Sequence, residues 1–156
     1  TLDNALKQFA HVVKSDLNKD ILQLSGGGAA GGMGAALVGV LNAELQPGVD
    51  IVIEALKLDN LVQDADLVIT GEGRIDSQTI HGKTPIGVAR TAKRYDKKVI
   101  AIAGCFTPDY SVVHEHGLDA VFAIVNRSVD LATALQEAEL NLQQTSRNIA
   151  ALLKLA

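Results

Sequence analysis

The segment TGEGRIDSQTIHGKT, residues 70–84, brings acidic and basic side chains together directly after an apolar run. It holds two carboxylates and three side chains that can carry positive charge: Glu72, Asp76, Arg74, His81 and Lys83. Phosphoryl transfer uses such a set, because carboxylates hold Mg²⁺ or accept the proton of an attacking hydroxyl while Lys or Arg neutralises the phosphoryl oxygens. Gly71 and Gly73 flank Glu72 and free its backbone to turn. The alternative is that these charges form ion pairs that only fix the loop.

The same segment ends as a phosphate-binding P-loop does, with Gly82, Lys83 and Thr84. The P-loop pattern, G-x-x-x-x-G-K-[ST], requires its first glycine where this chain has Ser77. A strand also runs directly into a true P-loop, whereas here six residues separate Ser77 from the apolar run that ends at Thr70. We therefore do not interpret the segment as a P-loop, and the carboxylates become its main feature.

A second candidate is the glycine cluster GGGAAGGMG, residues 26–34. Gly26, Gly28 and Gly31 satisfy G-x-G-x-x-G, but the preceding apolar segment is only ILQL, and no acidic residue about 20 positions on follows a convincing strand. Two interpretations stay open: close packing of the next helix through small residues, or binding of phosphate or carboxylate by exposed amides. A reductase module that binds a nucleotide or dinucleotide is the alternative function.

From residue 66 onward, the sequence pattern changes to alternating predicted strands and helices, which must position these residues. DLVIT, KVIAIAG and AVFAIV, which begin at residues 66, 98 and 120, are short and apolar, as strands buried on both faces of a parallel sheet are. Helical patterns follow over about 85–95, 109–116 and 130–154, and the last carries an expected core stripe of Leu131, Leu135, Leu142 and Ile149. This alternation predicts a doubly wound α/β unit, which binds ligands at the carboxyl ends of its strands.

The N-terminal part has a different rhythm, with three predicted helices over 2–17, 35–45 and 51–58. Asp50 is the expected cap of the third helix, although the β-branched start of that segment leaves a strand as the alternative. We place a domain boundary near residues 59–65.

Composition narrows the classes of function. The chain has 156 residues, 47% of them hydrophobic, and a net charge of −4 with its basic residues scattered, so we expect a globular protein that binds no nucleic acid. It has no apolar run long enough for a membrane span and no signal peptide pattern, and its single cysteine, Cys105, fits a reducing compartment. We expect a cytoplasmic protein without a membrane partner, and a small buried thiol at Cys105.

The chain resembles the C-terminal part of the type 1 glycerate kinases, the bacterial glycerate 2-kinase family. The resemblance rests on GGGAAGGMGAAL, NAELQPGVDIVIEAL, ADLVITGEGRIDSQTIHGKTPIGVA and VIAIAG, in that order. It implies an enzyme, a phosphotransferase with an alcohol group as acceptor, that uses ATP and Mg²⁺ to convert D-glycerate to 2-phosphoglycerate. Ser77 and Cys105 depart from the family, which often has glycine and serine there.

The resemblance also implies an architecture and residue roles. Residues 1–62 would be the C-terminal part of an inserted α/β domain with the glycine-rich loop, and residues 63–156 the C-terminal half of a Rossmann-like or flavodoxin-like domain. Implied roles are Mg²⁺ positioning or general base for Glu72 and Asp76, and phosphate or carboxylate binding for Arg74 and Lys83. Substrate or phosphate binding is expected at Gly26, Gly27, Gly28, Gly71, Gly73 and His81.

Because family chains are more than twice as long and this one opens on Thr1, we expect a portion of a longer protein with little kinase activity alone. Its partner would be the missing N-terminal part or a second copy. A purely structural half-domain is the non-enzymatic alternative.

Overall fold

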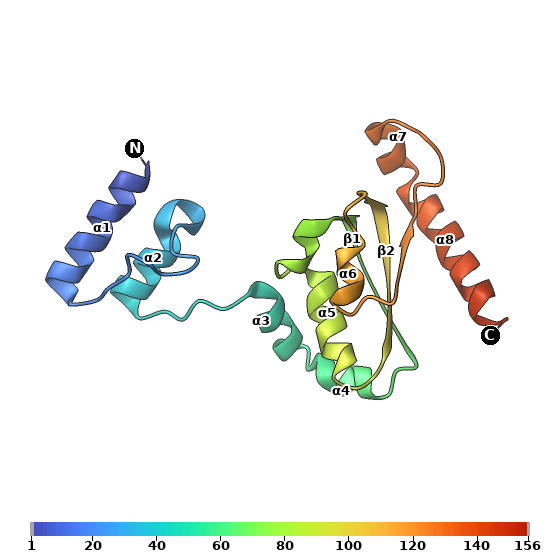
Figure 1. Ribbon diagram of the computed structural model, residues 1–156, viewed down its shortest axis with the longest axis horizontal. Coiled ribbons are helices and arrows are strands. Elements are labelled where there is room, and N and C mark those ends of the chain that lie inside the picture. The colour runs from blue at the N-terminus through green and yellow to red at the C-terminus, as the bar shows by residue number, and fades with distance from the viewer. Residues whose placement is uncertain (1, 156) are drawn as a thin grey trace. The chain divides into compact units, whose positions relative to one another are not determined.

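The computed structural model describes residues 2–155 and divides into two compact units, one ending at Pro47 and the other beginning at Gly48 (Figure 1). The first unit contains helices α1 (Leu2–Leu17) and α2 (Ala29–Leu41). The second contains a small sheet and the helices around it. The assignment of residues 1–62 to an inserted domain stays a prediction, since a compact unit need not coincide with an evolutionary domain.

Three parallel strands form the sheet of the second unit, in the order β1-β2-β3. They are β1 (Leu67–Ile75), β2 (Lys98–Phe106) and β3 (Ala120–Ala123). All three correspond to the apolar runs of the sequence, so the predicted parallel α/β class is confirmed. The expected end of the first strand was wrong, because β1 continues past Thr70 to Ile75 and includes the Gly71–Arg74 stretch.

Glycine permits the long first strand to lie close to its neighbour. A Cβ atom on Gly71 would lie 2.2 Å from the carbonyl oxygen of Ile102, and one on Gly104 would lie 2.4 Å from that of Gly73. Cβ atoms in real structures essentially never lie this close to another atom. Gly71 is therefore required by the close approach of β1 to β2, and not by a turn after the strand.

One face of the sheet is well covered. The 3₁₀ helix η1 (Ser77–Ile80) and α5 (Thr84–Lys93) connect β1 to β2, and α6 (Val112–Glu115) lies between β2 and β3. Eleven buried apolar residues from α4 (Leu58–Gln63), the strands, these helices and the loop before β3 form one core: Val62, Val68, Ile75, Ile86, Ala89, Ala92, Val99, Ala101, Ala103, Val113 and Leu118. Small alanines on α5 and β2 let helix and sheet approach closely.

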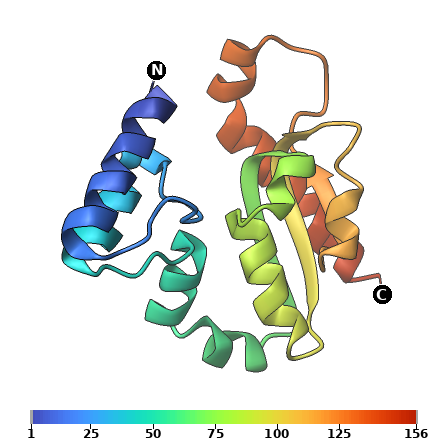
Figure 2. The same ribbon diagram turned by 60° about the vertical axis from the view of Figure 1, so that its left-hand side comes forward.

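The other face of the sheet is less well covered by helices. Helices α7 (Leu131–Gln136) and α8 (Ala138–Leu153) follow β3, and α8 lies across the sheet from α5 (Figures 1 and 2). Ile69 on this face is 56% exposed. The predicted core stripe was wrong for three of its four residues, since Leu131, Leu135 and Leu142 are exposed and only Ile149 is buried. The single helix predicted over 130–154 is two helices, separated at Glu137.

Helices α3 (Gly48–Ala55) and α4 (Leu58–Gln63) precede β1. Asp50 lies in the first turn of α3 and not at its cap, and it pairs with Arg90 of α5. Arg94 pairs with Asp59 of α4 in the same way, with 2.9 Å between Nη2 and Oδ1. These ion pairs connect the exposed side of α5 to the two short helices.

In the first unit, α1 matches the predicted helix over 2–17, and α2 begins within the glycine cluster, after Gly28. Ala30, Gly31 and Gly32 have left-handed backbone angles that interrupt the helix there. Four buried residues form the core of this unit: Ala10, Val13, Ile21 and Ala35. Met33, Leu37, Val40 and Leu41 remain exposed on α2.

Candidate functional site

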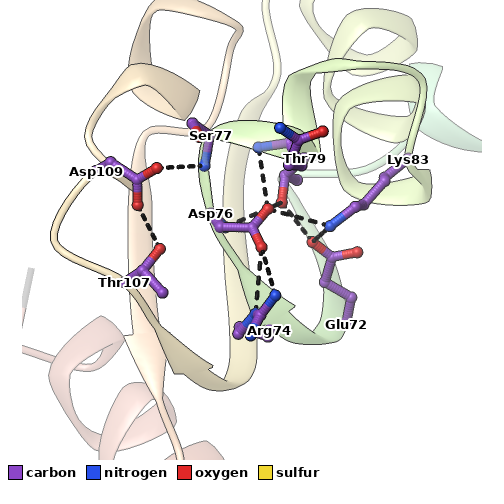
Figure 3. A network of polar contacts seen from close by, with 9 residues as sticks. Glu72, Arg74, Asp76, Ser77, Thr79, Lys83, Thr107 and Asp109 are labelled. Carbon is purple, nitrogen blue, oxygen red and sulfur yellow. Dashed lines mark hydrogen bonds and ion pairs between the residues drawn. The ribbon is translucent and has the colours of Figure 1, made fainter.

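The predicted charged residues meet where β1 ends and η1 begins (Figure 3). Nζ of Lys83 lies 3.2 Å from Oδ1 of Asp76 and 3.8 Å from Oε1 of Glu72. Arg74 approaches Asp76 from the opposite side, with its Nη2 3.1 Å from Oδ2. Two acids and two cations of the predicted set therefore form one cluster with balanced charge.

Strand geometry explains how these side chains come together. Glu72 and Arg74 are two residues apart on β1 and so point to the same face of the sheet. Asp76 follows the strand as the N-cap of η1, where its carboxylate accepts a hydrogen bond from the N–H of Gln78 at 3.0 Å. Lys83 is the N-cap residue of α5, so its side chain reaches the cluster from the next helix.

Asp76 is the most enclosed member of the cluster. Its side chain is 9% exposed, and both carboxylate oxygens have partners. Burial alone would raise the pKa of Asp76, but the hydrogen bond and charge of Lys83, the charge of Arg74 and the Gln78 amide together lower it. Asp76 is thus held as a carboxylate, with its oxygens occupied by protein groups.

Glu72 is more accessible, because 19% of its side chain is exposed. Its Oε1 accepts a hydrogen bond from the hydroxyl of Thr79 at 2.7 Å and faces Lys83. Within residues 2–155, Oε2 of Glu72 has neither a hydrogen bond nor an ion pair. Figure 3 shows this oxygen turned away from Asp76. Glu72 is therefore the acid with an oxygen available to a ligand.

Sequence reasoning missed two residues of this network. Thr79 is fully buried and contacts both acids. Asp109, which follows β2, accepts a hydrogen bond from the N–H of Ser77 at 3.3 Å and another from the Thr107 hydroxyl. The hydrogen bonds from Ser77 and Thr107 lower the pKa of Asp109 to about 2. The signal for Asp109 was present, since it lies in the loop after the second strand, where ligand-binding edges form.

The remaining predicted residues lie apart from the acids. His81 is exposed, and its side chain makes no hydrogen bond within the described residues. Gly71 and Gly73 lie inside β1, where the close approach of β2 explains Gly71 but not Gly73, so a role of either glycine in binding stays a prediction. Cys105 is exposed, in contrast to the buried thiol expected, and is in register with Arg74.

Gly26, Gly27 and Gly28 belong to the first unit, and the structure does not place them relative to Glu72. Turns precede them, and no strand lies between residues 18 and 28. The dinucleotide fingerprint requires a strand at that point, so the structure gives the reductase alternative no support. Gly27 and Gly28 border a cavity of about 320 Å³ whose lining also includes Lys7 and His11.

The described side chains fit a Mg²⁺ ion only in part. Residues 2–155 contain no group of three or more His, Cys, Asp or Glu side chains arranged to hold a metal. Lys83 occupies the space that a metal bridging Glu72 and Asp76 would need. A single carboxylate oxygen, Oε2 of Glu72, matches the way Mg²⁺ binds one carboxylate together with phosphate oxygens and waters.

The helices of the described region include none with the length and apolar character that a bilayer crossing requires. A parallel α/β sheet with a charged cluster at the carboxyl end of an edge strand defines a class of small-molecule binding proteins. Within that class, residues 1–154 match the sequence model of the glycerate kinase family, and the chain belongs to this family.

Individual relatives agree with this assignment. The chain is 55% identical to the glycerate 2-kinase of Escherichia coli over 97% of its length, and 51% identical to a glycerate kinase of Bacillus subtilis over 99%. A crystal structure of a Salmonella typhimurium LT2 protein assigned as glycerate kinase 2 superposes with a TM-score of 0.75 at 55% identity, covering 97% of this chain and 38% of that one. The chain spans about 40% of the length of the curated relatives.

Proposed function

We propose that this chain supplies the phosphoryl-transfer acids and cations of an ATP-dependent kinase that converts D-glycerate to 2-phosphoglycerate. The observation that carries the proposal is the convergence of Glu72, Asp76, Arg74 and Lys83 at one strand end in a member of the glycerate kinase family. The proposed site lies at the carboxyl edge of the sheet, where proteins of this architecture bind ligands. The chain is proposed to act as part of a longer protein.

The geometry suggests different roles for the two acids. Glu72, with Oε2 free of protein partners, is proposed to accept the proton of the attacking glycerate hydroxyl. The hydroxyl oxygen then bonds to the γ-phosphorus as the bond to the oxygen bridging the β- and γ-phosphates breaks, and ADP leaves. Asp76 is proposed to orient Lys83 and Arg74, whose charges stabilise the phosphoryl oxygens or bind the glycerate carboxylate.

Mg²⁺ is proposed as the accompanying ion, and Oε2 of Glu72 would hold it, together with the phosphates of ATP, only in the alternative in which another group accepts the proton. When bound, it would neutralise charge on the phosphate oxygens. Proton acceptance and metal binding compete for the same oxygen of Glu72, so in any one step that oxygen can serve only one of them. The glycine amides of Gly26–Gly28 are proposed to bind an anionic group of a substrate.

The test uses the complete kinase chain that contains this segment. Replacing the base in Glu72→Gln should lower kcat by about 100-fold or more, because a neutral amide cannot accept the proton. Glu139→Gln makes the same chemical change at an exposed position of α8 and should leave kcat unchanged. The position of the phosphate on the product is read by ³¹P NMR. Near-normal turnover by Glu72→Gln would contradict the proposal.

The 156-residue chain alone is a second test. It should show little or no glycerate phosphorylation, whereas the complete chain should be active under the same conditions. Full activity of the shorter chain would show that the rest of the protein is not needed.

A further inference from the structure

Thr79 lies at the centre of the charged cluster, although it carries no charge itself. Its side chain is fully buried, and its Oγ1 lies 2.7 Å from Oε1 of Glu72 and 3.4 Å from Oδ1 of Asp76. The backbone N–H of Asp76 donates to the same hydroxyl oxygen at 3.1 Å. One neutral side chain therefore touches both acids (Figure 3).

The direction of the Thr79 proton follows from these contacts. A hydroxyl has one proton to donate and two lone pairs that can accept. Because the N–H of Asp76 occupies one lone pair, the proton is free for a carboxylate, and the shorter distance assigns it to Glu72. The hydroxyl thus fixes which oxygen of Glu72 faces the protein.

Thr79 is itself held firmly. It belongs to η1, which begins with the reciprocal hydrogen bonds of a capping box between Asp76 and Thr79. The first residue of η1, Ser77, is bound through its N–H to Asp109 of the next loop. The branched Cβ of threonine further restricts its side-chain rotation.

We propose that Thr79 is a positioning residue for the phosphoryl transfer, in that its hydroxyl holds Oε1 of Glu72 so that Oε2 faces the substrate. The inference rests on the proposed function, since it requires Glu72 to act on a ligand. Thr79 is buried and so acts through Glu72, without touching the substrate. A carboxylate held in this way would lose less freedom on reaching its reactive geometry.

The test compares substitutions of Thr79 in the complete kinase chain. Thr79→Val keeps the shape and removes the hydroxyl, and we expect kcat to fall by about 10- to 100-fold. The KM values for glycerate and ATP should stay within about threefold, because the lost interaction orients the reacting group and does not bind substrate. Thr79→Ser restores the hydroxyl and should keep kcat within about threefold of the unmodified enzyme.

Thr91 provides a matched control. It is a second buried threonine, and its hydroxyl donates to the carbonyl oxygen of Gly87 within α5 at 3.1 Å. Thr91→Val therefore makes the same chemical change at similar burial without touching Glu72, and kcat should not change. A fall in kcat equal to that of Thr79→Val would mean that loss of any buried hydroxyl is sufficient, and would overturn the proposal.

A double substitution tests whether Thr79 acts through Glu72. In the Glu72→Gln background, Thr79→Val should reduce kcat by no more than about threefold further, because the two changes affect one pathway. If each substitution instead lowered kcat by its own full factor in the double variant, the result would contradict the proposal. Normal turnover by Glu72→Gln would instead overturn the proposed function, whereas an inactive Glu72→Gln with a fully active Thr79→Val would overturn this inference alone.

Folding is checked by circular dichroism for every variant. If Thr79→Val does not fold, Thr79→Ala takes its place with the same expected loss of kcat. Failure of both variants to fold would mean that the hydroxyl serves the structure of η1, and would overturn the proposal. Thr79→Ser that is as slow as Thr79→Val would do so as well.

Discussion

The two units of the chain are built with very different cores. The unit that begins at Gly48 buries eleven apolar residues in one cluster between a parallel sheet and helices α4, α5 and α6. The unit that ends at Pro47 buries four, while Met33, Leu37, Val40 and Leu41 remain exposed on α2. Helix α2 is apolar around most of its surface, which is typical of a helix that other elements cover on several sides. We therefore expect the sheet unit to be stable by itself and the helical unit to be marginal.

Spectroscopy can separate the two units. The chain has no tryptophan, and both tyrosines, Tyr95 and Tyr110, lie in the unit that begins at Gly48. Tyrosine emission therefore reports unfolding of the sheet unit only, whereas circular dichroism reports the helices of both.

The largest effect on the sheet unit is expected for Gly71→Ala. Its new Cβ would lie 2.2 Å from the carbonyl oxygen of Ile102, so the strands would have to separate. We expect the free energy of unfolding to fall by about 3 kcal/mol, as measured by urea denaturation followed by tyrosine emission.

Gly73→Ala is the control for this change, since its Cβ would meet no atom within 4 Å. It should cost less than about 1 kcal/mol. Equal stability of the two variants would contradict the close approach of β1 to β2.

A smaller effect on stability, which distinguishes the two units, is expected from alanine substitutions of two buried valines. Val113 of the sheet unit is fully buried, and Val13 of the helical unit is 4% exposed. Val113→Ala should lower the free energy of unfolding of the sheet unit by about 2 kcal/mol and shift the tyrosine transition. Val13→Ala should lower the helical signal in circular dichroism and leave the tyrosine transition in place. If Val13→Ala moves the tyrosine transition equally, the units unfold together and the comparison fails.

Acid should weaken the loop contact that Asp109 makes in the sheet unit. Its pKa is lowered from 3.8 to about 2 in the folded state, so the folded form prefers the carboxylate. The resulting stabilisation is present above pH 3.8 and is lost as the pH falls through 2. The stability difference between the unmodified chain and Asp109→Asn, from urea titrations at each pH, should therefore shrink over this range. A constant difference would mean that the hydrogen bonds from Ser77 and Thr107 do not depend on the charge.

The smallest effect is expected for Leu135→Ser on α7. Leu135 is 68% exposed, so little apolar area is lost on substitution. The free energy of unfolding should change by less than about 0.5 kcal/mol. Ile149→Ser on α8 is the contrasting variant, because Ile149 is 6% exposed and its replacement should cost several times more.

Sequence patterns predicted most of the sheet unit. The strands near residues 66, 98 and 120 were found because short β-branched runs have few other stable environments. The extension of β1 through Gly71 and Gly73 was not predicted, since glycine is unfavourable inside a strand. Here a contact with β2, which no local pattern encodes, overrides that preference. The stripe on α7 and α8 was wrong because periodicity indicates a face and does not reveal what covers it.

Sequence reasoning predicted four charged residues of the site and missed Thr79 and Asp109. Glu72, Arg74, Asp76 and Lys83 could be found from residue types within one segment, and the structure brings them together. Thr79 was passed over because a threonine in a loop has many roles, and only its burial and distances distinguish it. Gly26–Gly28 remain a prediction, since their relation to the acids depends on the arrangement of the two units.

The exposure of Cys105 makes this chain convenient for labelling. It is the single cysteine of the sequence, and it is paired in register with Arg74 on the neighbouring strand. A maleimide dye or nitroxide would attach at one position without any cysteine being added or removed. Its signal would come from the strand beside the charged cluster, so the proposed binding of a nucleotide and of glycerate could be tested directly in solution.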